Sequence, residues 1–248
     1  MTETVDFDQA VTAQYLQTLT DPDLGVVQPT GIDNLYRLSA QPVSNGESRP
    51  LLVITGPSQS GKDSVVHALV SGGNYSRLRT AVTRERRDWE APDAMVWMRQ
   101  KGPDESFEDY VPALVNEYGL VEHDVHNGHV YGVPSSSFDE ILEGVTPILN
   151  VDVRGIRSLR GKLPFRLIGI MICPESAASL EQRIRRLGTD VVGRLAAAQS
   201  YLQEANGIID YMFVNADSDD PASAVERASR AVQIAVAVET GQTNHTSK

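Results

Sequence analysis

The sequence has few of the features that mark secreted, membrane-bound or nucleic-acid-coating proteins. Its 248 residues include one cysteine, Cys173, which cannot close an internal disulfide and ends an apolar run where we expect burial. No apolar run approaches the roughly 20 residues that a transmembrane helix needs. The N-terminus has neither a basic stretch nor an apolar signal core. We therefore expect a cytoplasmic protein with no membrane partner.

Positive charge is also scarce. The chain has 22 Lys and Arg against 33 Asp and Glu, a formal net charge of -11. A protein that coats nucleic acid needs a broadly basic face, so nucleic acid is not an expected partner. The arginines are nevertheless clustered, with five over residues 77–87 and four over residues 183–194. Guanidinium clusters bind small phosphorylated ligands, although solvated surface arginines are the alternative.

Apolar runs alternate with amphipathic segments along most of the chain. Residues 51–54 form a short apolar run that ends at a glycine turn, which predicts a buried strand. A helix is expected directly after the turn. Further strands are predicted at Pro147–Asp152, Leu167–Cys173 and Tyr211–Val214, and further helices from about Gly155, over Ser176–Leu187, around Tyr201 and over Pro221–Val238. This order predicts an α/β fold with a parallel sheet covered on both faces.

The two ends of the chain differ from this pattern. Residues 1–49 carry seven acids against two bases, with scattered proline and glycine and one plausible helix near Phe7–Leu19. We expect an acidic, flexible N-terminal extension over 1–49, a single domain over 50–240 and a disordered tail over 241–248.

A candidate phosphate-binding loop lies between the first strand of the domain and its first helix. It reads Gly56-Pro57-Ser58-Gln59-Ser60-Gly61-Lys62-Asp63-Ser64. Backbone N–H groups of a glycine-rich loop can point at phosphate oxygens, and the following helix N-terminus adds partial positive charge. Lys62 supplies a point charge for the β- and γ-phosphates of ATP.

The loop departs from the strict motif in one position. The motif has Ser or Thr directly after the lysine, whereas here Asp63 stands there and Ser64 follows. Ser64 is therefore the candidate ligand for the Mg²⁺ that accompanies ATP. Asp63 either complements the helix dipole or acts as an outer-sphere magnesium ligand or an acceptor-side group.

Several ordered motifs resemble those of the guanylate kinase family, from about residue 50 to residue 238. Gly56-Pro57-Ser58 with Gly61-Lys62 is similar to the family's G-P-S-G-x-G-K loop. The other matches are Thr83-Arg84-Glu85-Arg86-Arg87 with T-R-x-x-R, Glu122 through Gly128 and Tyr131-Gly132 with E-x-x-x-x-x-G-N-Y-Y-G, Asn150-Val151-Asp152 with D-x-D, Arg183, Gly188-Thr189 and Arg194 with the R-x-x-x-R-G-T lid and its later arginine, and Val214-Asn215-Ala216-Asp217 with V-N-D-D.

The resemblance implies a P-loop NTPase fold with a small acceptor-binding lobe and a short lid, and transfer of the γ-phosphoryl of ATP to GMP or dGMP. It assigns catalytic roles to Lys62, Arg183 and Arg194, and places Asn215 beside the adenine. On the acceptor side it assigns Thr80 and Glu122 to the guanine, Arg84, Arg87 and Tyr131 to the acceptor phosphate, and Asn150 and Asp152 to the same pocket.

Departures from the family pattern lie mostly on the acceptor side and leave two alternatives open. Where the family has a tyrosine, a serine and an aspartate, this sequence has about Val96, Val133 and Asn150. Lys-Asp-Ser and Tyr-Gly-Val also look like the related ribose 1,5-bisphosphate phosphokinases, which make phosphoribosyl diphosphate, whereas Glu122 favours guanine. A non-catalytic guanylate-kinase-like module that binds a protein partner is the other alternative, although such modules commonly lose the loop residues that this chain has.

Overall fold

The computed structural model describes residues 28–30, 32, 34–38, 49–88, 90–126, 128–186, 188, 190–205, 207–216 and 220–241. The helix expected near Phe7–Leu19 lies outside these residues, as does the tail predicted over 241–248 except for its first residue. Thr189 and Asp217, from two of the quoted motifs, also lie outside them.

A seven-stranded sheet forms the centre of the molecule, in the order β1-β2-β11-β10-β3-β9-β4. Its five parallel strands are β3 (Pro50–Thr55), β4 (Tyr75–Arg77), β9 (Thr146–Asn150), β10 (Arg166–Pro174) and β11 (Tyr211–Asn215). The strand β3 lies between β9 and β10, with Leu52 opposite both Ile148 and Ile168. The predicted parallel sheet is confirmed, and β3, which leads into the phosphate-binding loop, is at its middle.

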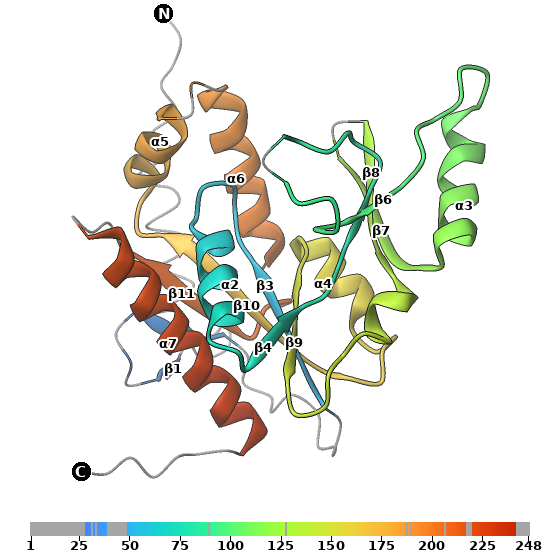
Figure 1. Ribbon diagram of the computed structural model, residues 1–248. Helices are drawn as coiled ribbons and strands as arrows, with labels where there is room; N and C mark the ends of the chain where they lie inside the picture. Colours follow the sequence, from blue (N-terminus) through green and yellow to red (C-terminus); the bar gives the residue numbers. More distant parts are fainter. Residues whose placement is uncertain are drawn as a thin grey trace, which may run out of the picture.

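Helices cover both faces of this sheet (Figure 1). On one face, the helices α2 (Lys62–Ser71) and α7 (Pro221–Thr240) pack on Leu52 and Ile54. On the other, α4 (Val153–Leu159) and α6 (Val191–Ala205) pack on Leu51 and Val53. Successive strand residues point to opposite faces, so an uninterrupted apolar run is what a strand covered on both sides requires.

A small lobe stands beside the main sheet (Figure 1, green). Its four strands lie in the order β6-β5-β8-β7 and carry the helix α3 (Phe107–Tyr118). The strands are β5 (Ala81–Val82), β6 (Val96–Trp97), β7 (Leu120–His126) and β8 (His129–Pro134), and the short 3-10 helix η2 (Ser135–Phe138) leads back toward the main sheet. Its core includes Tyr110, Leu114 and Val130. The small lobe that the family resemblance implied is therefore present.

Two short strands precede the domain boundary predicted at residue 50. The strands β1 (Gln28–Pro29) and β2 (Leu35–Arg37) extend the sheet, and β2 pairs antiparallel with β11. Leu35 is 1% exposed and belongs to the main core. The described part of the predicted extension therefore belongs to the domain. A three-residue strand is too short to show a hydrophobic period, which is why the sequence pattern missed it.

A buried carboxylate near the end of α7 links this edge of the sheet together. Glu239 accepts hydrogen bonds from Arg37 Nη2 at 2.9 Å, Arg166 Nη2 at 2.7 Å and the Tyr211 hydroxyl at 2.7 Å. These partners lie on β2, β10 and β11. The two ion pairs satisfy a carboxylate whose side chain is 2% exposed, and a buried charge of this kind is tolerated only when it is paired.

The remaining helix and the cysteine agree with the expected pattern. The helix α5 (Ala177–Arg185) packs against α6 through Leu180, Ile184 and Ala198. Cys173 is 5% exposed, as predicted. Among the described helices, none combines the length and the apolar character that crossing a membrane requires.

Candidate active site

The candidate site lies where the parallel strands end. The loop Gly56–Gly61 follows β3, Asn150 ends β9 with Asp152 two residues further on, and Asn215 ends β11. The carboxyl ends of parallel strands share one edge of a sheet, which is where α/β folds bind ligands. The structure thus brings the predicted donor-side residues and two of the predicted acceptor-side residues, Asn150 and Asp152, to one edge of the main sheet.

Two glycines determine the shape of the phosphate-binding loop. Gly56 has φ +147°, and a Cβ there would lie 2.2 Å from the Ile172 carbonyl oxygen on β10. Gly61 has φ +94°, and its Cβ would lie 2.6 Å from Asn215 Nδ2. Both positions therefore need glycine for backbone conformation and for space. Gly61 is also the N-cap of α2 and makes no side-chain cap bond, so the first-turn N–H groups are left available to an anion.

Side chains from three later elements contact this loop. Asn215 Nδ2 donates to Ser60 O at 2.9 Å. Arg183, on α5, donates through Nη2 to Asn215 O at 3.0 Å and through Nη1 to the carbonyls of Gln59 and Ser60, both at 3.4 Å. Arg194, on α6, donates to Ser58 Oγ at 2.8 Å. The two arginines predicted for the lid therefore lie at the loop, together with Asn215.

The residues that follow the loop glycine connect the donor and acceptor sides. Lys62 begins α2, and its Nζ lies 3.8 Å from Asp63 Oδ2. Asp63 Oδ1 accepts from Asn150 Nδ2 at 2.8 Å. Asp63 thus bridges the first turn of α2 and the end of β9, a contact that the sequence did not predict. Ser64 lies exposed in the same turn.

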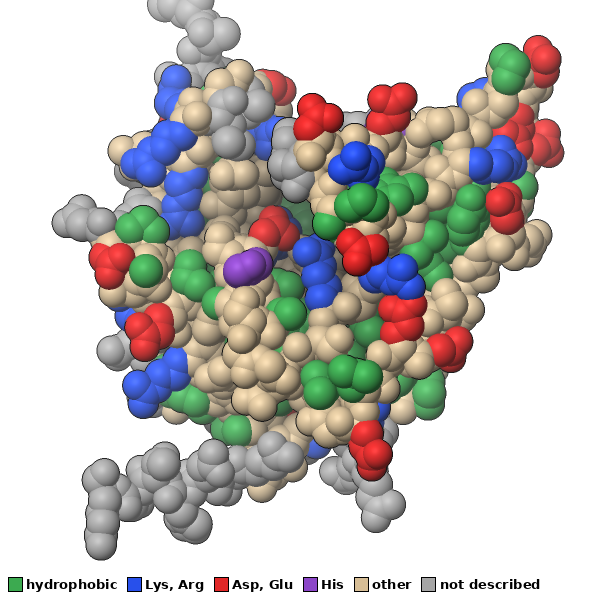
Figure 2. Space-filling model, viewed as in Figure 1, with side chains coloured by type: hydrophobic (Ala, Val, Ile, Leu, Met, Phe, Trp, Pro, Cys, Tyr) green, Lys and Arg blue, Asp and Glu red, His purple; other side chains and the backbone are tan. Residues whose placement is uncertain are grey.

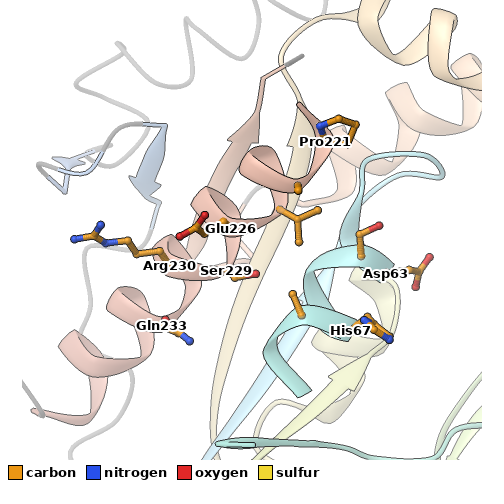
Figure 3. A pocket seen from close by; sticks show the side chains of 11 residues that line it. Asp63, His67, Pro221, Glu226, Ser229, Arg230 and Gln233 are labelled. Carbon is orange, nitrogen blue, oxygen red and sulfur yellow. The ribbon is translucent and has the colours of Figure 1, made fainter. Parts of the chain in front are cut away.

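A groove lies on the other side of α2, away from the small lobe (Figure 3). It has a volume of about 1040 Å³ and is lined by residues of α2 and α7. Its charged lining consists of Asp63, Glu226 and Arg230, with His67 beside them. Two acids against one base do not concentrate positive charge, so the lining of this groove does not favour a polyphosphate.

The charges on this side of the molecule are mixed. Figure 2 shows basic side chains gathered at the upper left of the view, over α5, and basic and acidic side chains interspersed over the small lobe at the right. Positive charge is therefore local, at the loop and in the small lobe, as the clustered arginines predicted.

In the small lobe, Arg84 forms a bidentate ion pair with Glu90. Its Nη1 and Nη2 donate to the two carboxylate oxygens at 2.7 and 2.5 Å, and its guanidinium carbon lies 5.7 Å from the centroid of the Trp97 ring. Glu90 also accepts from the Arg87 backbone N–H at 2.9 Å. The hydrogen bond from Arg84 lowers the pKa of Glu90 to about 2. Glu90 therefore links the Arg84 side chain to the backbone of Arg87, and the Arg84 guanidinium is held in this ion pair with its side chain 14% exposed.

Sequence reasoning did not single out Glu90. Its position six residues after Arg84, inside an arginine-rich segment, was the available signal. Tyr131 lies close enough to contribute to the raised pKa of Arg84, behind the larger effect of Glu90. Thr80 accepts a backbone hydrogen bond from Val96 through its carbonyl at 2.9 Å and is half-buried just before β5.

Three carboxylates gather between the small lobe and the main sheet. Glu122 is 6% exposed, and burial raises its pKa to about 7, with further contributions from Asp152 and Asp124. Asp152 caps α4 by accepting from Gly155 N at 2.7 Å, and its pKa is also raised by burial. The predicted acceptor residues Glu122 and Asp152 are thus brought together from different lobes. Together with Asp124 they form an acidic, partly desolvated cluster.

The histidines of the β7–β8 hairpin lie along its two strands. His126 pairs with His129 across the turn, and His123 pairs with Gly132. No cluster of three or more potential metal ligands occurs among the residues that the structure describes.

Comparison with known proteins gives concordant results. The family model for guanylate kinase matches residues 48–232. A guanylate kinase from Synechocystis sp. is 34% identical over 175 residues, 68% of this chain and 87% of that protein. One from Prochlorococcus marinus is 30% identical over 183 residues, 71% of this chain and 95% of that protein.

The chain belongs to the guanylate kinase family. The match includes the loop, the small lobe, α5, α6 and β11. The crystal structure of guanylate kinase from Anaplasma phagocytophilum has a TM-score of 0.54 at 22% identity, over 81% of this chain and 89% of that one, which supports the fold. The family resemblance, the P-loop fold and the phosphotransferase class predicted from the sequence are confirmed.

The close approach of Gly56 to the backbone of β10 leaves no room for a side chain at this position. Gly56→Ala should lower the free energy of unfolding by at least about 3 kcal/mol. The new Cβ would clash with the Ile172 carbonyl oxygen, and alanine would be strained at the positive φ of this position. Gly73→Ala is the matched control: its φ is +81° but nothing lies within 4 Å of its Cβ, so only about 1 kcal/mol of strain is expected. Urea unfolding followed by circular dichroism measures both. Equal costs for the two variants would contradict the close packing of the loop on β10.

Proposed function

We propose that this protein transfers the γ-phosphoryl group of ATP to GMP or dGMP, giving ADP and the guanosine diphosphate. The observation that carries the proposal is the proximity of the buried Glu122 to Asp152, which follows β9 at the same edge of the sheet as the phosphate-binding loop. Membership of the guanylate kinase family supports it.

The donor half suits a nucleotide polyphosphate. The first-turn N–H groups of α2 receive no side-chain cap, Lys62 begins this helix, and Arg183 and Arg194 hydrogen-bond to the loop. Mg²⁺ prefers oxygen ligands, and the exposed Ser64 hydroxyl and Asp63 carboxylate offer them in the first turn. Bound with ATP, the ion would neutralise charge on the β- and γ-phosphates; Ser64 would hold it directly and Asp63 through water.

The acceptor half suits guanine. Guanine presents N1–H and N2–H donors along one edge, and two carboxylates side by side can accept from both. Adenine has an acceptor at N1 and no 2-amino group, so it would leave a buried carboxylate without a partner. Arg84, Arg87 and Tyr131 would then bind the phosphate of the same nucleotide.

Phosphoryl transfer here needs alignment and charge balance more than covalent chemistry. The attacking phosphate oxygen of GMP is already ionised, so no general base is required. A new bond forms between that oxygen and the γ-phosphorus while the bond to the β–γ bridging oxygen breaks, and ADP leaves. Arg183 and Arg194 would balance the charge on the transferring group. Both arginines already lie at the loop, and over a bound nucleotide they would help to exclude water from the transferring group.

An acceptor panel tests the proposal. The full chain with Mg²⁺ and ATP is assayed for ADP release with GMP, dGMP, AMP, CMP, UMP and ribose 1,5-bisphosphate. We expect turnover with GMP and dGMP, and at least about 100-fold lower kcat/KM with the other acceptors, because a buried carboxylate left unpaired is costly. Turnover with ribose 1,5-bisphosphate alone would overturn the guanine assignment, and no turnover with any acceptor would favour a non-catalytic module.

We place the reaction in the cytoplasm.

Removing the loop ammonium tests the donor half. Lys62→Ala should lower kcat with GMP by at least about 1,000-fold, because the β- and γ-phosphates lose their point charge during transfer. The side chain lies at the start of a helix, is 21% exposed and has Asp63 at 3.8 Å as its one ion-pair partner among the described residues, so we expect little change in the thermal unfolding midpoint. Near-normal turnover in a folded variant would remove Lys62 from the mechanism.

The raised pKa of Glu122 predicts a pH dependence. Glu122 is neutral below about pH 7 and ionised above it, so the form that accepts from guanine is lost as the pH falls. From pH 6 to pH 8, kcat/KM for GMP should rise about tenfold more in the wild type than in Glu122→Gln. The comparison between the two proteins is needed because the GMP phosphate itself titrates near pH 6. An identical pH profile for both proteins would assign the titration to another group.

A further inference from the structure

Tyr201 lies on α6, seven residues after Arg194, and its hydroxyl reaches the start of the phosphate-binding loop. The hydroxyl oxygen lies 3.2 Å from the Gly56 backbone nitrogen and is hydrogen-bonded to Thr55 Oγ1. Burial raises the pKa of Tyr201 to about 12, so the phenol is neutral and can both donate and accept. Neither the loop motif nor the lid motif includes this residue.

The donors and acceptors around Tyr201 allow one direction for these hydrogen bonds. Thr55 Oγ1 lies 2.8 Å from the carbonyl oxygen of Val151, which can only accept, so the Thr55 hydrogen is used there. Thr55 must therefore accept from the Tyr201 hydroxyl, and Tyr201 accepts from the Gly56 N–H. The result is a continuous chain from Gly56 N–H through Tyr201 and Thr55 to Val151 C=O.

This series of hydrogen bonds joins three parts that phosphoryl transfer has to align: the donor loop, the acceptor-side residues after β9, and α6. Gly56 opens the donor loop, and Val151 lies between the acceptor-side residues Asn150 and Asp152. The helix that carries Tyr201 also carries Arg194, which donates to Ser58 Oγ at 2.8 Å. Residues seven apart lie on the same face of a helix, two turns from each other. The helix α6 therefore contacts the loop at two points along that face, beside β3 (Figure 1).

We propose that Tyr201 is a positioning residue that fixes the donor loop relative to the acceptor strand and to α6. The kinetic part of this inference rests on the proposed phosphotransfer. Tyr201 acts through Gly56 and Thr55, both buried, so water cannot easily replace its hydroxyl. The loop amides of α2 and Lys62 still bind the nucleotide without it. What is lost is the fixed spacing between the two phosphates that react.

Loss of alignment predicts an effect on kcat rather than on binding. Tyr201→Phe should lower kcat with GMP about tenfold or more, while the KM values for ATP and GMP change less than about threefold. Thr55→Val interrupts the same chain and should have a similar effect. The double variant should be no more than about twofold worse than either single one, because both changes remove one unit.

Tyr211→Phe is the matched control. The Tyr211 hydroxyl donates one buried hydrogen bond, to Glu239 at 2.7 Å, at the start of β11 and thus at the opposite end of the sheet from the site. This variant should lose thermal stability to a similar extent and keep wild-type kcat, measured well below the unfolding midpoint of every protein.

A second measurement does not depend on activity. Hydrogen–deuterium exchange of the peptide that spans Gly56–Gly61, in the full chain without nucleotide, should be at least about fivefold faster in Tyr201→Phe and unchanged in Tyr211→Phe. Unchanged loop exchange overturns the inference, and so does wild-type kcat in Tyr201→Phe. If the wild-type protein turns over no acceptor, the proposed function fails, and the exchange result alone decides whether Tyr201 positions the loop.

Discussion

The tight turn between β3 and α2 is the constraint on which the rest of the site depends. A loop can surround phosphates with backbone N–H groups only if its own side chains and its neighbours leave the approach free. Here the neighbours are close: Gly56 packs on the backbone of β10, and Gly61 packs on the side chain of Asn215. The loop therefore restricts how closely β10 and the end of β11 can pack beside it.

Electrostatics then divides the site into unlike halves. The chain is acidic as a whole, yet Lys62, Arg183 and Arg194 gather at the loop, where a polyphosphate needs them. Across from them, Glu122 and Asp152 form an acidic wall whose burial disfavours ionisation until a ligand supplies donors. The polyphosphate of a nucleotide complements the basic half, and a base with N–H donors complements the acidic half.

Much of the main domain could be predicted because its strands are apolar and its helices have a clear period. The loop could also be predicted, because its glycine spacing and its place between a strand and a helix are local features of the sequence. The contacts that organise the site are not local. Glu90 pairs with an arginine inside an irregular turn, and Tyr201 reaches residues about 146 positions away in sequence. The strand β2 escaped prediction because three residues cannot display a pattern, although burial of Leu35 makes it part of the core.

The most direct test of the central claim is calorimetric titration of the folded full chain with ATP and Mg²⁺, at two temperatures so that a small enthalpy at one of them cannot hide binding. Our account predicts one saturable site per chain that excess GMP does not displace. Folded protein that gives no heat of binding at either temperature would show that the turn after β3 does not bind a nucleotide polyphosphate, and the kinase assignment would be contradicted.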